Sequence, residues 1–348
     1  MIKIHRKLRN VHQRFIVIEL VTFFMTIIFS GCEKKTGYIT IEGMVWNTVY
    51  HITYEGPTNF KDSILPVLND VSLSLSIFDK QSLVNQLNTS DSVIADENLI
   101  AVYDESKRIS RISRGVFDPT ISPLVTAWGF GICHAATSDT AYVDSILKFV
   151  GIDKTYRSNN IIYKKDRRTQ FNFSAIAKGF GCDAIGEMFR NNGIQNYMVE
   201  IGGELVLSGK SPSGDKWRIS IDAPSSSNNT HNESAMIVGL TDMGVATSGN
   251  YRNFRLDGDK TLAHTISPLT GYPYLSEILS VTVIAPSCME ADGLATACMA
   301  SSPEEAQRIL KESGAEGLFI FRDSLWMTKD FKNYIIGEVS EPGKTVRN

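Results

Sequence analysis

A carboxylate and a hydroxyl four residues apart form the clearest candidate for chemistry in this sequence. Ser287 and Glu290 form a capping box, the pattern that begins many helices, directly after an apolar stretch. Asp292 and Thr296 then share one face of the predicted helix, near its positive end. This pair provides too few oxygen ligands for calcium. It suits magnesium, which keeps water ligands and binds substrate phosphates. From spacing alone, a solvent-facing Asp beside a packed Thr is the more ordinary interpretation.

A second candidate lies at residues 172–181, where a predicted strand runs into a predicted helix. The opening turns of that helix hold small residues and Lys178. Free N–H groups and the helix dipole make such a junction a site for anions, and the ammonium of Lys178 adds a full charge. The spacing is neither a Walker loop nor GxGxxG. A Ser-capped surface helix with a solvated lysine is therefore the alternative.

Two further clusters have the composition of binding loops. Residues 246–253 and 264–273 are polar, glycine-bearing turns that include Arg252 and His264. A lone histidine is, however, more often a structural hydrogen-bonding residue than an acid or base. Residues 117–131 hold two prolines and a Trp-Gly-Phe-Gly string, which would form either a rigid wall against a flat ring or a buried turn.

These clusters lie among predicted strands and helices, identified by apolar periods of two and of about 3.6 residues. Strands are predicted at residues 40–54 (two strands around a turn at 46–48), 161–163, 170–173, 197–207, 217–221, 235–240, 279–285 and 317–321. Helices are predicted at 60–76, 98–113, 142–150, 175–190, 288–300 and 303–313. No segment resembles a linker. We therefore expect a mixed α/β (α+β) fold in one continuous catalytic unit, with two lobes as an option.

Composition excludes several classes of protein. With 348 residues, 43% of them hydrophobic and 21% charged, the chain is neither disordered nor a coiled coil. A formal net charge of −3 provides no basic face for nucleic acid. The cysteines after Cys32 show no CxxC spacing, so we expect free buried thiols and no cysteine metal cluster.

Residues 1–31 have the organisation of a bacterial lipoprotein signal peptide. A basic segment precedes the apolar run 15–30, which is shorter than the roughly 20 residues that a spanning helix needs. The run leads into the sequence FSGC, a lipobox whose cysteine, Cys32, would be lipidated. Glu19 in the run and Phe29 in the lipobox depart from the usual pattern, and a short uncleaved anchor helix is the alternative.

We therefore predict a signal peptide at 1–31 and a catalytic domain at 32–348. Cleavage removes five basic residues and one acidic residue, so the mature chain carries a net charge of −7. An acidic chain would be held on the cell membrane by its lipids and not by anionic headgroups. We expect it on the extracytoplasmic, periplasmic side.

The order of the motifs resembles the ApbE family of flavin transferases, which move FMN from FAD onto a protein. The resemblance extends from residue 43 to about 331. Its most specific strings are residues 175–179, 201–204, 247–252, 264–273 and 290–292 with Thr296. It implies a fold related to the T-fold. An N-terminal lipobox is also common in that family.

The resemblance also implies roles for individual residues. Met44 and Phe78 would line the FAD site, and Val116, Phe117 and Asp118 would hold the flavin end. Asn172 and Lys178 would contact the dinucleotide, and Ile266 would touch it beside His264. Magnesium would be held by the carbonyl of Ala175, by Asp292 and by Thr296. Three residues depart from the family pattern, which often has Asp there: Asn172, Ser267 and Ala295.

The reaction implied is magnesium-dependent transfer of FMN from FAD to a Thr or Ser hydroxyl of a partner protein, with release of AMP. Lys178 would neutralise phosphate charge, and His264 is the candidate general base. Expected acceptors are subunits of Na⁺-translocating NADH:quinone reductases or Rnf-type complexes. The sequence leaves two alternatives open: a magnesium-dependent FAD pyrophosphatase giving FMN and AMP, and a non-catalytic FAD-binding lipoprotein.

Overall fold

The computed structural model describes residues 37–130, 139–222, 234–249, 254–257, 260–263, 265–338 and 345–346. Among the residues with predicted roles, Cys32 and His264 lie outside the described residues, as do residues 1–31, the predicted signal peptide, and residues 250–253. The predicted division of the chain at residue 31 therefore stays a prediction.

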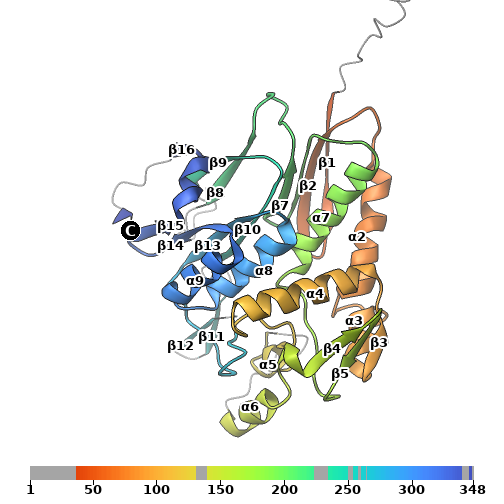
Figure 1. Ribbon diagram of the computed structural model, residues 1–348, viewed down its shortest axis with the longest axis vertical. Helices are drawn as coiled ribbons and strands as arrows, with labels where there is room; N and C mark the ends of the chain where they lie inside the picture. The colour runs from red at the N-terminus through yellow and green to blue at the C-terminus, as the bar shows by residue number, and fades with distance from the viewer. Residues whose placement is uncertain are drawn as a thin grey trace, which may run out of the picture. The chain divides into compact units, whose positions relative to one another are not determined.

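A nine-stranded sheet forms the centre of the unit that begins at Tyr38 (Figure 1). Its order is β1-β2-β6-β7-β10-β13-β14-β15-β17, and every neighbouring pair is antiparallel except β15 with β17. The strands are β1 Tyr38–Val45, β2 Thr48–Glu55, β6 Tyr197–Ile201, β7 Glu204–Ser208, β10 Met243–Gly249, β13 Ser280–Ala285, β14 Glu316–Ile320, β15 Ser324–Met327 and β17 Thr345–Val346.

Helices cover one face of this sheet (Figure 1). Helix α7 (Ala177–Asn191) lies against β6 and β7, and α8 (Cys288–Met299) lies against β10 and β13. Helix α2 (Lys61–Leu75) packs on α7, while α4 (Glu97–Ile112) and α9 (Pro303–Ser313) pack on α8. Because α7 and α8 also contact each other, side chains from both can meet above the middle of the sheet.

A small sheet covers the opposite face of β7, β10, β13 and β14. Its order is β16-β9-β8, formed by β8 Trp217–Asp222, β9 Ser234–Leu240 and β16 Ile335–Glu338. Leu207, Val245 and Ile284 of the large sheet share one apolar cluster with Trp217 and Val238 of the small one. Parts of the central strands are therefore buried on both faces, which fits the short apolar runs 205–207 of β7 and 283–285 of β13.

The remaining elements surround this core. They are α3 Leu83–Thr89, α5 Ser122–Ala127, α6 Thr140–Leu147, the sheet of β3 Ser92–Ile94, β5 Ile161–Lys164 and β4 Thr155–Ser158, the hairpin of β11 Phe254–Asp257 and β12 Lys260–Ala263, and two 3₁₀ turns, Ile152–Lys154 and Lys329–Tyr334. No helix in the described ranges combines the length and the apolar content that crossing a bilayer requires.

The predicted mixed α/β class is confirmed, and most predicted elements form near their expected bounds. Residues 170–173 are an exception, because only Gln170 forms an isolated bridge, to Ile121. The amide of Phe171 instead donates to the side chain of Asn88, and the amide of Asn172 donates to the carbonyl of Pro119. An alternating pattern here reflects burial of two phenylalanines and not a sheet.

Two other predictions need correction. The single strand expected at 197–207 is two strands, because Gly202 and Gly203 turn the chain with φ of +63° and +102°. Residues 247–249, expected in a loop, continue strand β10, where Thr247 hydrogen-bonds Thr282 of β13. Their polar character reflects the cavity beside them and not a turn.

Candidate active site

A cavity of about 780 Å³ lies beside the first turn of α7 and extends along α8 from Asp292 to Met299. Its size is in the range of sites for small molecules and cofactors. It is lined by residues of the loop 116–119, the segment 172–178, the turn between β6 and β7, strand β8, the end of β10, the segment 265–268, and α8. Each lining segment belongs to a different element, so the cavity exists only in the folded chain.

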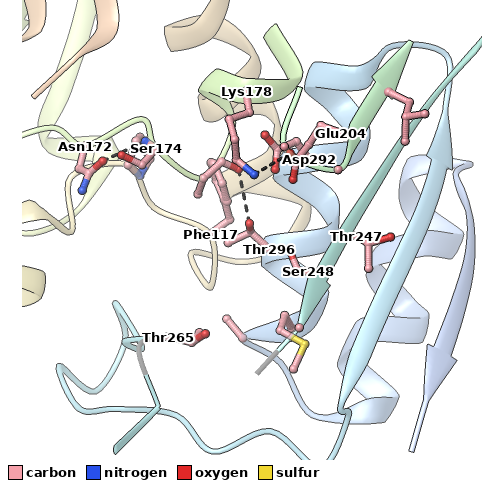
Figure 2. A pocket seen from close by; sticks show the side chains of 18 of the residues that line it. Phe117, Asn172, Ser174, Lys178, Glu204, Thr247, Ser248, Thr265, Asp292 and Thr296 are labelled. Carbon is pink, nitrogen blue, oxygen red and sulfur yellow. Dashed lines mark hydrogen bonds and ion pairs between the residues drawn. The ribbon is translucent and has the colours of Figure 1, made fainter. Parts of the chain in front are cut away.

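An ion pair lies in the polar part of the cavity wall (Figure 2). The ammonium of Lys178, in the first turn of α7, lies 2.6 Å from Oε2 of Glu204, the first residue of β7. Asp292 of α8 lies beside them and is only 4% exposed, as is Glu204. Burial and then the charge of Glu204 raise the pKa of Asp292 well above its usual range. Burial tends to lower the pKa of Lys178, but Glu204 and Asp292 outweigh it and the pKa is raised.

Three oxygen-bearing groups of different kinds, a hydroxyl, a backbone carbonyl and a carboxylate, lie next to this ion pair. The hydroxyl of Thr296 donates to the carbonyl of Ala175 at 3.4 Å, and Oδ2 of Asp292 accepts the amide of Gly179 at 3.0 Å. Figure 2 shows Thr296 and Asp292 on the same side of the cavity as Lys178. No cluster of three or more His, Cys, Asp or Glu side chains suited to a metal occurs within the described residues.

This donor set fits a magnesium ion. A carbonyl, a hydroxyl and one carboxylate are hard oxygen ligands, and magnesium completes its shell with water and phosphate oxygens. The charge balance also fits, because two buried carboxylates, Asp292 and Glu204, share the single ammonium of Lys178. An added cation would offset the remaining negative charge.

The amide groups at the start of α7 are less available to an anion than the sequence predicts. The amide of Ala177 donates to the carbonyl of Phe173, and the amide of Gly179 donates to Asp292. The helix begins at Ala177, two residues later than predicted, and has no side-chain cap. The positive charge that this junction offers to a phosphate is therefore mainly the ammonium of Lys178.

Comparison with known proteins supplies the family. The model of the ApbE family matches residues 46–319. The chain belongs to the ApbE family. A FAD:protein FMN transferase of Haemophilus influenzae is 32% identical over 328 residues, which cover 89% of this chain and 94% of that relative. A FAD:protein FMN transferase of Vibrio cholerae is 32% identical over 316 residues, covering 87% and 93%.

Solved structures of ApbE proteins share the fold. The flavin transferase ApbE from Vibrio cholerae superposes with a TM-score of 0.77 at 30% identity, covering 86% of this chain and 99% of that one. The apo flavinyl transferase ApbE of Pseudomonas stutzeri gives a TM-score of 0.78 at 28% identity, covering 87% and 98%. The family resemblance seen in the motifs is therefore confirmed over most of the chain.

The loop 116–119 of this ApbE chain lines the cavity, and the side chain of Asp118 also connects the loop to neighbouring segments. Its carboxylate accepts the amide and hydroxyl of Thr120 and the amide of Ile152, at 2.6–2.8 Å. Burial raises its pKa, while these hydrogen bonds oppose the shift. Asp118 therefore shapes the loop, and it also lines the cavity together with Val116, Phe117 and Pro119.

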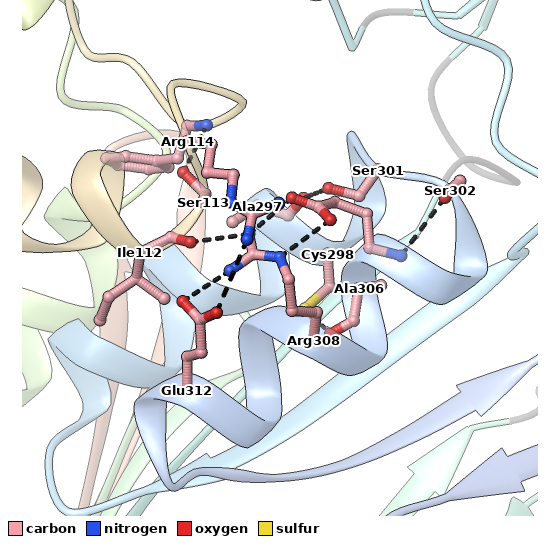
Figure 3. Close-up of polar contacts among 12 residues, drawn as sticks. Ile112, Ser113, Arg114, Ala297, Cys298, Ser301, Ser302, Ala306, Arg308 and Glu312 are labelled. Atoms are coloured by element: carbon pink, nitrogen blue, oxygen red, sulfur yellow. Dashed lines mark hydrogen bonds and ion pairs between the residues drawn. The ribbon is translucent and has the colours of Figure 1, made fainter.

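The end of α4, which precedes this loop, is attached to α9 through Arg308 (Figure 3). The guanidinium of Arg308 donates to the carbonyl of Ile112, the last residue of α4, at 2.8 Å. It also pairs with Glu305 and Glu312 on its own helix. Because Val116 follows four residues after Ile112, this contact fixes the point from which the cavity loop leaves α4.

The other predicted FAD contacts divide into two groups. Asn172 and Ile266 line the cavity; Asn172 Oδ1 accepts the amide of Ser174, and Ile266 is 4% exposed. Met44 and Phe78 are not among the residues that line it, and their side chains are 72% and 75% exposed. The structure therefore does not bring these two to the cavity.

Sequence reasoning gave no role to Glu204 or Asp183. Glu204 appeared only within a family string, since its partner Lys178 lies 26 residues away. Asp183, on α7, accepts two amides at the start of α8, and burial raises its pKa to about 6. Cys182, Cys288 and Cys298 are buried free thiols as predicted, and Cys133 lies outside the described residues.

Proposed function

We propose that this chain transfers FMN from FAD to a hydroxyl group of a protein. The observation that carries the proposal is the polar wall of the cavity, where Lys178, Asp292, Thr296 and the carbonyl of Ala175 surround one position suited to phosphate and a cation. Relatives that match nearly their full length bear the name FAD:protein FMN transferase. A protein flavin acceptor follows from that activity.

In the proposed reaction, the oxygen of an acceptor Thr or Ser attacks the phosphorus on the FMN side of FAD. The bond from that phosphorus to the bridging oxygen breaks, and AMP leaves with the bond's electrons. The ammonium of Lys178 offsets charge on the phosphates as the bond breaks. The proton of the hydroxyl passes to a base, for which we propose His264 from its place in the family motif.

Magnesium would be held by the carbonyl of Ala175, by Asp292 and by Thr296. When bound there, it would supply positive charge to the pyrophosphate and make the phosphorus a better electrophile. The side chains around it have separate tasks: Lys178 binds phosphate, and Glu204 holds the ammonium of Lys178 at 2.6 Å.

We also propose that Cys32 carries lipid and that the enzyme works on the extracytoplasmic side of the cell membrane. Its acceptors would then be membrane-bound redox subunits, of the Na⁺-translocating NADH:quinone reductase or Rnf type. The basic n-region, the apolar run and the lipobox support the anchor, and a lipid anchor would keep the enzyme next to such acceptors.

The test is an assay with full-length chain, FAD, magnesium and a candidate acceptor protein. Mass spectrometry should show the acceptor gaining one FMN, with one AMP released per FMN attached. The Asp292→Ala chain, or wild type with EDTA, should give neither product, because the cation would lose its only carboxylate ligand. Release of AMP and free FMN without labelled acceptor would replace transfer with FAD hydrolysis. Full activity of Asp292→Ala would remove magnesium from the proposal.

A further inference from the structure

Two carboxylates hold the starts of α7 and α8 against each other. Asp292 of α8 accepts the amide of Gly179, near the start of α7, at 3.0 Å. In return, Asp183 of α7 accepts the amide of Cys288 with Oδ1 at 3.0 Å and the amide of Met289 with Oδ2 at 2.8 Å. The first turn of each helix is therefore bound by a side chain of the other.

The two kinds of cap on α8 have different consequences. Ser287 is the local N-cap and accepts the amide of Glu290 at 3.1 Å. Such a cap begins a helix but does not place it relative to the rest of the molecule. Asp183 takes the two preceding amides, which Ser287 leaves unsatisfied. These two bonds attach the start of α8 to α7.

The first turn of α8 also has backbone close on two sides. A Cβ on Gly179 would lie 2.4 Å from the carbonyl oxygen of Cys288, and a Cβ on Gly244 of β10 would lie 2.2 Å from the amide nitrogen of Cys288. These glycines let α8 approach α7 and β10 closely. Contact of this kind limits how closely the elements can approach. Directed hydrogen bonds are needed to fix the position of the helix along its axis and its rotation about that axis.

The position of the first turn of α8 affects the cavity through Asp292. Asp292 follows Cys288 by four residues and lies on the same face, one turn later. A shift of the first turn would move its carboxylate relative to the carbonyl of Ala175 and the ammonium of Lys178. Asp183 itself is not among the residues that line the cavity.

We propose that Asp183 is a positioning residue of the active site: by holding the amides of Cys288 and Met289, it places Asp292 for binding a divalent cation. The inference rests on the metal ligands named in the proposed function. It predicts a loss of cation affinity from a side chain that touches neither the cation nor FAD, as residues behind metal ligands often produce.

The experiment measures Mn²⁺ binding by electron paramagnetic resonance on full-length chain in detergent, without FAD. The variants are Asp183→Asn, which keeps the shape but only one acceptor oxygen, and Asp183→Ser, which is smaller and keeps one hydroxyl. The matched control is Ser302→Ala, which removes the N-cap of α9, where Ser302 accepts the amide of Glu305. Each protein is measured 20 °C below its own melting temperature, so that a loss of stability does not appear as a loss of binding.

We expect both Asp183 variants to bind Mn²⁺ about 10–100-fold more weakly, while Ser302→Ala binds it like wild type. FAD affinity measured in EDTA should stay within about twofold of wild type. In the transfer assay, the magnesium concentration that gives the half-maximal rate should rise for the Asp183 variants by the same factor as their Mn²⁺ dissociation constants. Saturating magnesium should restore most of their rate. Asp292→Ala serves as the reference for loss of the ligand itself.

Two outcomes would overturn the inference in distinguishable ways. If Asp292→Ala loses Mn²⁺ binding but whichever Asp183 variants fold bind it like wild type, Asp183 only stabilises the helix pair and the metal assignment stands. If Asp292→Ala binds Mn²⁺ like wild type, the metal ligands themselves are wrong, and the inference fails with them. Failure of both Asp183 variants to fold, with Ser302→Ala folded, would make Asp183 a folding residue and also contradict a positioning role.

Discussion

Lys178 contributes separately to stability and to the charge of the cavity. Its ammonium neutralises the buried carboxylate of Glu204 at 2.6 Å, and the same ammonium faces the position proposed for phosphate. Removing one member of a buried pair costs more than removing both, because the remaining charge is left without a partner. A double-mutant cycle can therefore separate the two contributions.

Lys178→Met should lower the free energy of unfolding by about 1–2 kcal/mol, a reduced figure because the side chain of Lys178 is 35% exposed. It should also slow FMN transfer by about 10²–10³-fold, since charge stabilisation of the breaking bond is lost. Adding Glu204→Gln should restore most of the lost stability, which urea denaturation measures. It should restore none of the transfer rate. Recovery of transfer in the double variant would show that Lys178 acts only by neutralising Glu204.

A second lysine, Lys164, gives the chain a pH dependence unrelated to catalysis. Its side chain is buried and donates to the carbonyls of Asn88, Arg167 and Thr169. Burial lowers its pKa from 10.5 to about 8. Between these two values the unfolded chain binds more protons than the folded one, so the free energy of unfolding should rise with pH across that window.

Comparison with Lys164→Met isolates this effect from other titrations. The variant loses the hydrogen bonds at every pH, which is a constant offset. The wild-type free energy of unfolding should therefore gain about 1–3 kcal/mol relative to the variant between pH 7.5 and pH 10. Urea denaturation at several pH values measures the difference. A difference that does not change with pH would mean that Lys164 keeps an ordinary pKa.

At the scale of elements, the contact between α7 and α8 decides the geometry of the site. Gly179→Ala should lower the free energy of unfolding by about 1–3 kcal/mol, although alanine favours helix, because the new Cβ would lie 2.4 Å from the carbonyl oxygen of Cys288. Thermal unfolding measures the loss. Gly337→Ala is the control, since the nearest atom to its Cβ among the described residues would be the Cβ of Ile237 at 3.6 Å. Equal stability of the two variants would show that the helices can separate at no cost.

At the scale of the whole molecule, the proposed lipid anchor at Cys32 would decide where the enzyme works. If Cys32 is lipidated, the Cys32→Ala chain should lose lipid label and accumulate as a precursor that retains residues 1–31. Metabolic labelling with a fatty acid and N-terminal mass analysis measure both. The purified Cys32→Ala chain should still transfer FMN in solution, because all the described residues that line the cavity follow residue 115. Wild-type protein that keeps residues 1–31 would contradict the lipoprotein prediction.

The sequence by itself determined what depends on neighbours along the chain. The capping box of Ser287 and Glu290 identified α8, and helical spacing placed Asp292 and Thr296 on one face, because contacts within a turn involve residues three or four apart. The motif strings also identified the family, since they keep their order along the chain. These features require no knowledge of which elements pack together.

Only the tertiary structure decided which of these residues meet. Thr296 reaches the carbonyl of Ala175 from 121 residues away, and Asp183 reaches the amide of Cys288 from 105. Packing also brought the carboxylate of Asp118 to Thr120 and Ile152, and it left Met44 and Phe78 outside the cavity wall. The physical reason is that local propensity forms each helix and strand, whereas burial of their apolar faces selects the neighbours. A site built from several elements is therefore specified only when that packing is complete.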